Sequence, residues 1–120
     1  MQHVILVKEN SETPVIDYMN SAALVAGNPR RETWNAFDSP DGTCTAGIWA
    51  SQPGAWRFEF PTTKTEFFCV IDGRARVSNQ NGEAWEVGPG EAAVIPGGFR
   101  GQFHVLEAMR KYFVIVERED

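Results

Sequence analysis

Histidine and cysteine are scarce in this 120-residue chain, which has two of each. The cysteines, Cys44 and Cys69, form no CxxC motif, and we expect two reduced thiols in or near the core. Neither has a histidine near it in the sequence, and no GxSxG motif occurs, so no nucleophile–base arrangement is found. The glycine-rich stretch GPGEAAVIPGG leads into strands and not into a helix, which argues against a phosphate-binding loop.

Long hydrophobic runs and basic stripes are also missing. No segment approaches the ~20 apolar residues of a membrane span. The apolar run in the N-terminal MQHVILVKEN has neither a basic leader nor a small-residue cleavage site, so it does not resemble a signal peptide. The net charge is -5 and lysine and arginine form no stripe, which makes nucleic acid an unfavourable partner. We expect a cytoplasmic protein that binds neither membranes nor nucleic acid.

Short β-branched and aromatic runs are what the sequence does have, in a chain with four Trp and eight Phe. The runs predict strands at 43–51, 55–60, 66–71, 74–79, 83–87, 91–96, 101–107 and 111–117. Turn signals separate them at 39–42, 51–54, 72–73, 79–82 and 88–90. Short strands at this spacing indicate an all-β antiparallel sandwich or barrel, and the length fits one domain.

The first 30 residues differ from the rest and are expected to form an N-terminal arm, followed by a barrel over 31–120. The arm has a predicted strand at 3–7 and a polar loop, and a short helix fits within 17–23. Residues 26–32 contain Gly and Asn-Pro and are expected to be a loop. Apolar edge strands and the extended arm suggest a homodimer in which the arm adds to a partner's sheet.

Two spaced motifs identify a family resemblance. Glu66 is followed after six residues by Gly73, and Gly90 is followed after five residues by Pro96-x-Gly98. This spacing resembles the two motifs of the cupin superfamily. That resemblance implies a small double-stranded β-helix barrel, an RmlC-like jelly roll.

The resemblance is narrower over most of the chain, from about residue 33 to 116. Segments 47–60, 65–103 and 105–115 resemble the cupin subfamily known as DUF861 or cupin-3. That subfamily is similar to the cupin domains of ureidoglycine aminohydrolases and of an ethanolamine-utilisation protein. The resemblance therefore implies a fold, and a small-molecule site inside it, more firmly than any one reaction.

The chain departs from the superfamily pattern at its usual metal ligands. Histidines would fall at 59 and 61, or at 60 and 62, where this sequence has Glu59, Phe60, Pro61 and Thr62. A further histidine would fall at Gly101, so Glu66 alone remains of the four usual ligands. We expect no metal and no other cofactor, because a transition metal generally needs three or more converging protein ligands. The alternative is a weakly held hard divalent ion at Glu66.

Strand alternation predicts which side chains enter the barrel. If Glu66 points inward, Phe68 does too, while Cys69 points away. The same parity places Phe103 inside and leaves His104 outside. Neither Cys69 nor His104 is therefore expected to join Glu66 in a metal site.

Glu66 is the most informative candidate catalytic residue. In an aromatic pocket, desolvation would equip its carboxyl as a general acid or base, whereas a nearby cation would keep it ionised. Arg110 and Lys111 lie on the last predicted strand, and one of them should point inward. The family pattern and the alternation together imply a buried Glu66–Lys111 pair.

The candidate ligand-binding residues are mostly aromatic side chains on inward-facing strands, namely Trp49, Trp56, Phe58, Phe68 and Phe103. Arg100 follows the Pro-Gly-Gly turn and could attract a carboxylate at the rim. Three functions stay open. The first is a metal-free cupin that binds a small polar or carboxylated metabolite. The second is an aminohydrolase-, isomerase- or lyase-like enzyme that uses Glu66 with Lys111. The third is a non-catalytic protein-interaction barrel.

Overall fold

The computed structural model describes residues 2–8 and 12–119. The elements in this part of the chain are β1 (Val15–Asp17), the 3-10 turn η1 (Ser21–Ala23), β2 (Leu24–Ala26), β3 (Arg31–Asp38), β4 (Cys44–Ser51), β5 (Gly54–Glu59), β6 (Lys64–Asn79), β7 (Ala84–Val87), β8 (Ala92–Ile95) and β9 (Arg100–Glu117). No helix in the described ranges has the length and apolarity that crossing a membrane requires. The all-β prediction is confirmed.

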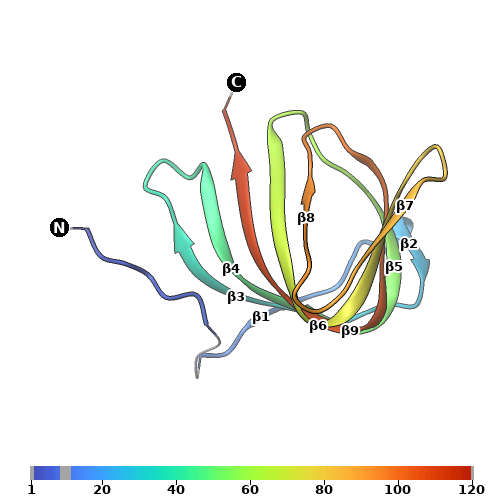
Figure 1. Ribbon diagram of the computed structural model, residues 1–120, viewed down its shortest axis with the longest axis horizontal. Coiled ribbons are helices and arrows are strands. Elements are labelled where there is room, and N and C mark those ends of the chain that lie inside the picture. The colour runs from blue at the N-terminus through green and yellow to red at the C-terminus, as the bar shows by residue number, and fades with distance from the viewer. Residues whose placement is uncertain (1, 9–11, 120) are drawn as a thin grey trace.

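Two long strands, β6 and β9, hold the molecule together. They pair antiparallel from Lys64↔Glu117 to Asn79↔Gly101, and each contributes one half to each of two sheets. The described strands are hydrogen-bonded into one continuous nine-stranded sheet, which bends into two faces that we call the two sheets. The first has the order β1-β3-β4-β9-β6-β8, and the second has the order β2-β5-β9-β6-β7. The strands curl so that the two sheets face each other, which makes the predicted barrel (Figure 1).

The sequence predicted β6 and β9 wrongly as two strands each, with Asp72-Gly73 as a turn. Each is one continuous strand, and the pairing register shifts where Asp72 lies opposite Arg110. Gly73 has a φ of +83°, and a Cβ there would overlap the carbonyl oxygen of Ala108. Asp72-Gly73 therefore bends the strand between the two sheets and does not reverse the chain.

Strands β1, β2 and β3, in the N-terminal third of the chain, were not predicted from the sequence. β3 spans Arg31–Asp38, although residues 26–32 were predicted as a loop. Its pairing with β4 is irregular between Asn35 and Phe37, so its apolar and polar residues do not alternate cleanly. β1 and β2 are three residues long, too short to give a periodic signal.

The predicted strand at residues 3–7 is wrong, because the segment pairs with no strand of the described residues, and residues 3–6 are exposed. In Figure 1 it lies outside the barrel, next to the label N. The short helix expected within 17–23 is reduced to the 3-10 turn η1. The Asn20 side chain caps that turn by accepting a hydrogen bond from the backbone N–H of Ala22 at 2.9 Å.

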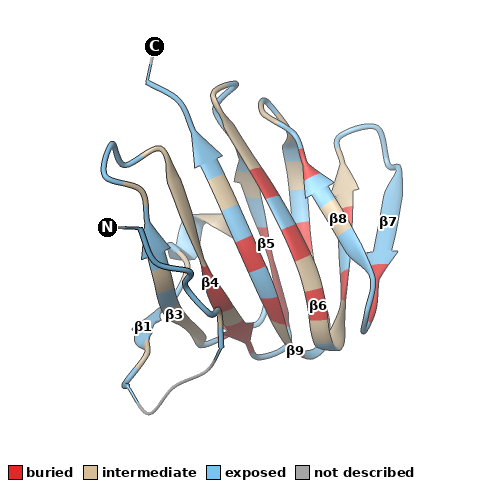
Figure 2. Cartoon of the chain, turned by 60° about the vertical axis from the view of Figure 1, so that its left-hand side comes forward, coloured by how far each residue is buried: buried red, intermediate tan, exposed pale blue. Residues whose placement is uncertain are grey.

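Alternation along β6 and β9 decides the core, as predicted. Phe68 and Phe103 are buried, whereas Phe67 is 45% exposed on the outer face. Figure 2 shows buried and exposed residues alternating along these strands. Full burial of a phenylalanine side chain contributes about 1.5–3 kcal/mol, so this alternation specifies the register of both strands.

Candidate functional site

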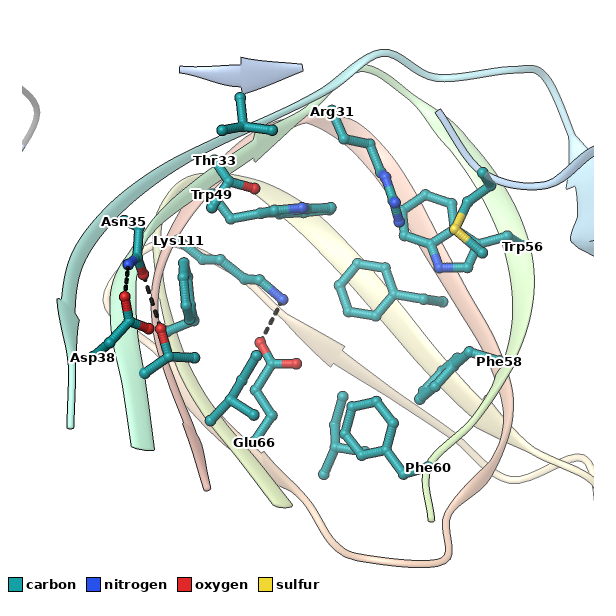
Figure 3. Close-up of a pocket in the computed structure, with 17 residues that line it drawn as sticks. Arg31, Thr33, Asn35, Asp38, Trp49, Trp56, Phe58, Phe60, Glu66 and Lys111 are labelled. Atoms are coloured by element: carbon teal, nitrogen blue, oxygen red, sulfur yellow. Dashed lines mark hydrogen bonds and ion pairs between the residues drawn. The ribbon is translucent and has the colours of Figure 1, made fainter. Parts of the chain in front are cut away.

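A cavity of about 550 Å³ lies between the two sheets (Figure 3). We call it the central cavity. Strands β3, β4, β5, β6 and β9 supply most of its walls, and Met19 reaches it from the segment between β1 and η1. Its lining residues are Val15, Met19, Arg31, Thr33, Asn35, Asp38, Thr45, Trp49, Trp56, Phe58, Phe60, Glu66, Ile95, Phe103, Lys111, Phe113 and Ile115. The mostly apolar walls with few polar groups are typical of small-molecule sites.

A buried ion pair lies in the wall of the central cavity. Lys111 Nζ donates a hydrogen bond to Glu66 Oε2 at 2.8 Å, and the two side chains are 7% and 10% exposed, respectively. Glu66 comes from β6 and Lys111 from β9, on the faces that alternation predicts. Because removing either charge from water is costly, the pair is stable here only while each partner neutralises the other.

Three aromatic rings surround the Lys111 ammonium. Its Nζ lies 4.5 Å from the ring centroids of Trp49 and Phe68 and 4.9 Å from that of Phe103. The negative faces of aromatic rings attract a cation, by about 2 kcal/mol or more where water is excluded. The rings and Glu66 therefore hold the lysine in one place.

Beside the ion pair, the central cavity has an aromatic wall. Trp56 stacks on Phe103 at a centroid distance of 5.4 Å, and Phe58 meets Phe60 edge to face at 5.2 Å. Phe58 also lies 6.5 Å from Phe103, so the rings form one continuous surface. Such contacts add about 0.5–1.5 kcal/mol per pair to what burial of the rings contributes.

The rim of the central cavity has polar residues that the sequence analysis missed. Arg31 donates to Asp17 from Nε at 3.0 Å and from Nη2 at 2.6 Å, and its guanidinium lies 5.3 Å from the Trp56 ring centroid. Asn35 donates to Asp38 at 2.6 Å. These positions were missed because 26–32 was predicted as a loop and no strand was predicted over 33–38.

The predicted site residues separate into three groups. Trp49, Trp56, Phe58, Glu66, Phe103 and Lys111 line the central cavity together. Phe68 is fully buried behind the Lys111 ammonium. Arg100 does not line the cavity and instead forms an exposed ion pair with Glu59 at 3.2 Å.

The residues present do not fit the metal centre that the superfamily pattern implies. No group of three His, Cys, Asp or Glu side chains suited to a metal occurs within residues 2–8 and 12–119. Glu66 is bonded to Lys111, whose positive charge occupies the position next to the carboxylate. At Gly101 any Cβ would overlap the carbonyl oxygen of Ser78, so the backbone leaves no room for a histidine. The expectation that no metal binds stays a prediction.

The curled two-sheet barrel and its internal cavity define a cupin-type β-barrel protein. The chain belongs to the family of EutQ-like cupin domains, whose model matches residues 38–113. The matched region includes Glu66, Lys111 and the aromatic wall. The family resemblance predicted from the two motifs is confirmed.

Solved structures of similar fold include a DUF861-family protein of unknown function from Pseudomonas syringae, with a TM-score of 0.77 and 20% identity over 88% of this chain and 45% of that one. The EutQ protein of Clostridium difficile gives a TM-score of 0.64 and 20% identity over 76% of this chain and 65% of that one. A putative ethanolamine utilization protein Q from Salmonella typhimurium gives a TM-score of 0.66 and 15% identity over 92% of this chain and 100% of that one.

The chain thus spans less than half of the Pseudomonas protein and about two thirds of the Clostridium protein. No curated protein sequence matches it. At identities of 15–20% these likenesses show the fold alone.

Proposed function

We propose that this protein binds a small polar metabolite in the central cavity. The observation that supports the proposal is a 550 Å³ aromatic-walled space with one buried ion pair, Glu66–Lys111, in its wall. This is large enough for one small ligand, and apolar walls with a few fixed polar groups are what such ligands need.

Two features favour binding over the alternatives. A barrel used only for protein contacts has no need of an internal cavity, and its aromatic residues would fill the interior. An acid–base enzyme needs a carboxyl that is free to exchange a proton with its substrate, whereas Glu66 already accepts a hydrogen bond from Lys111 at 2.8 Å. The pair is therefore better suited to recognising a ligand than to transferring a proton.

A fragment screen by protein-observed NMR tests the proposal. Polar fragments are expected to shift the indole N–H signals of Trp49 and Trp56, which line the cavity, and not that of Trp85, which is exposed on β7. Binding is expected to persist with a chelator present, because the described residues contain no group of three His, Cys, Asp or Glu side chains that could hold a metal. Trp49→Ala should weaken binding about tenfold through the lost ring contact, while Trp85→Ala should leave it unchanged. Fragments that shift Trp85 alone would contradict the proposal.

We also propose that the protein is cytoplasmic and forms a homodimer through residues 3–7. Val4 is 89% exposed and Leu6 is 70% exposed, and the segment pairs with no described strand. In β3, residues 34–38 pair with β4 on one side, while β1 covers only 31–33 on the other. An extended apolar arm from a second copy can add to such an open edge.

Light scattering after size-exclusion chromatography measures the dimer. The wild-type protein is expected to have twice the mass of one chain. The double variant Val4→Lys with Leu6→Lys is expected to have the mass of one chain at the same concentration. Lys8→Gln, next to the arm, serves as a control that keeps the dimer. A wild-type protein that stays monomeric at high concentration would contradict this part of the proposal.

A further inference from the structure

We infer that the ligand of the central cavity is uncharged, and that it offers a hydrogen-bond donor and an acceptor side by side. This inference rests on the proposed function. The sequence analysis left open whether the ligand is a small polar or a carboxylated metabolite. The inference chooses the uncharged polar ligand over the carboxylated one. The charges around the cavity and the unused bonding capacity of the Glu66–Lys111 pair lead to it.

Both cations that line the central cavity are already neutralised. Lys111 is bonded to Glu66, and Arg31 is bonded through two nitrogens to Asp17. Asp38 is the remaining charged group of the lining, and it accepts a hydrogen bond from the uncharged Asn35 amide. The lining together with Asp17 has two positive and three negative groups, so an anionic ligand would add to an excess of negative charge.

A carboxylated ligand would also have to share the Lys111 ammonium with Glu66. Two carboxylates against one ammonium in an apolar cavity would leave one charge desolvated without a partner. A cationic ligand would have to share the Glu66 carboxylate with Lys111, which would leave one positive charge desolvated without a partner. An uncharged ligand leaves the pair intact and avoids both costs.

The pair still has bonding capacity on the cavity side. Glu66 Oε2 accepts the bond from Lys111, while Oε1 receives none from any described residue. Every fully buried polar side-chain atom in the described ranges has a hydrogen-bond partner. Oε1 has none, so it is not fully buried, and Glu66 lines the central cavity. Figure 3 shows this second oxygen of Glu66 on the side away from the bond to Lys111. An ammonium has three N–H groups, and one described oxygen, Glu66 Oε2, accepts from Lys111.

A ligand group such as a primary amide or a hydroxy-carbonyl matches this arrangement. Its N–H or O–H would donate to Glu66 Oε1, and its carbonyl oxygen would accept from Lys111 Nζ. The body of the ligand would lie against Phe58, Phe60 and Phe103, which make up the apolar wall beside the pair. The three parts of the site thus select a planar or apolar body with one uncharged polar edge.

Three probes with the same phenyl ring test the inference: the uncharged benzamide, the anionic benzoate and the cationic benzylammonium. Their dissociation constants are measured by NMR titration of the Trp49 and Trp56 indole signals in the full chain. Benzamide is expected to bind about tenfold more tightly than either charged probe, because a charged probe leaves one unneutralised charge in the site. Benzoate binding as tightly as benzamide, or more so, would overturn the inference and leave the proposed function standing.

Two variants make the ranking specific to the ion pair. Glu66→Gln frees the Lys111 charge and should move the preference to benzoate, whereas Lys111→Met frees Glu66 and should move it to benzylammonium. Glu59→Gln alters an exposed pair outside the cavity and should keep the wild-type ranking. If one variant fails to fold, the wild-type ranking and the other variant decide. If none of the three probes shifts either indole while the fragment screen gives ligands that do, the inference fails and the proposed function stands. If the fragment screen also gives none, both fail.

Discussion

Replacing Lys111 with Met is expected to lower the free energy of unfolding by about 3–5 kcal/mol, because Glu66 would remain as a buried charge without a partner. Glu66→Leu should also destabilise the protein, since it leaves the ammonium with its aromatic rings but no counter-charge. The double variant Glu66→Leu with Lys111→Met should recover most of the loss, because an apolar pair of similar volume has no desolvation cost. Urea denaturation of the four proteins measures all three changes and their coupling energy.

An exposed ion pair in the same fold provides the matched control. Glu59 and Arg100 lie 3.2 Å apart on the surface, and Glu59→Gln is expected to change the free energy of unfolding by less than about 1 kcal/mol. If the double variant were as unstable as the sum of the single variants, the two residues would be acting independently. The account of a mutually neutralising pair would then be wrong.

Replacing Gly73 with Ala is expected to destabilise the protein by more than about 3 kcal/mol, which combines two separate costs. The φ of +83° is unfavourable for any residue with a Cβ. The new methyl group would also overlap the carbonyl oxygen of Ala108 and lie 2.6 Å from the Cβ of Met109. Neither neighbour can move freely, because both belong to β9, where it bends together with β6.

Gly82 separates the two costs. It has nearly the same φ, +85°, but a Cβ there would meet nothing within 4 Å. Gly82→Ala should therefore show the backbone cost alone, about 1–2 kcal/mol. Thermal or urea denaturation of both variants gives the difference, which is the contribution of close packing at the bend. Equal losses in the two variants would show that packing at Gly73 contributes nothing.

Strand alternation made part of the site predictable. The faces of Glu66, Phe68 and Phe103 followed from a period of two residues, which is a local property of an extended chain. The Glu66-x6-Gly73 spacing indicated the family for a related reason. Gly73 lies at the bend of β6 with a φ of +83°, so the spacing from Glu66 to Gly73 is the distance along the strand from the ion pair to the bend.

The rim residues could not be predicted in the same way. Arg31 lies on a strand that was predicted in part as a loop, and its partner Asp17 comes from a three-residue strand. Arg100 follows the Pro-Gly-Gly turn and was predicted at the rim of the site, but it forms an ion pair with Glu59 outside the cavity. Turn chemistry shows where a chain changes direction, and it does not show which neighbour a side chain will meet.

By itself, the sequence determined an all-β cupin-type barrel and the inward faces of its long strands, because motif spacing and alternation are local. The family pattern implied that Lys111 and Glu66 pair, but only the tertiary structure decided that they meet at 2.8 Å across 45 residues of sequence. It also decided that three rings enclose the ammonium and that a cavity remains beside them. Distances of this kind depend on the register of β6 against β9 and on how tightly the two sheets curl, and these are properties of the whole chain.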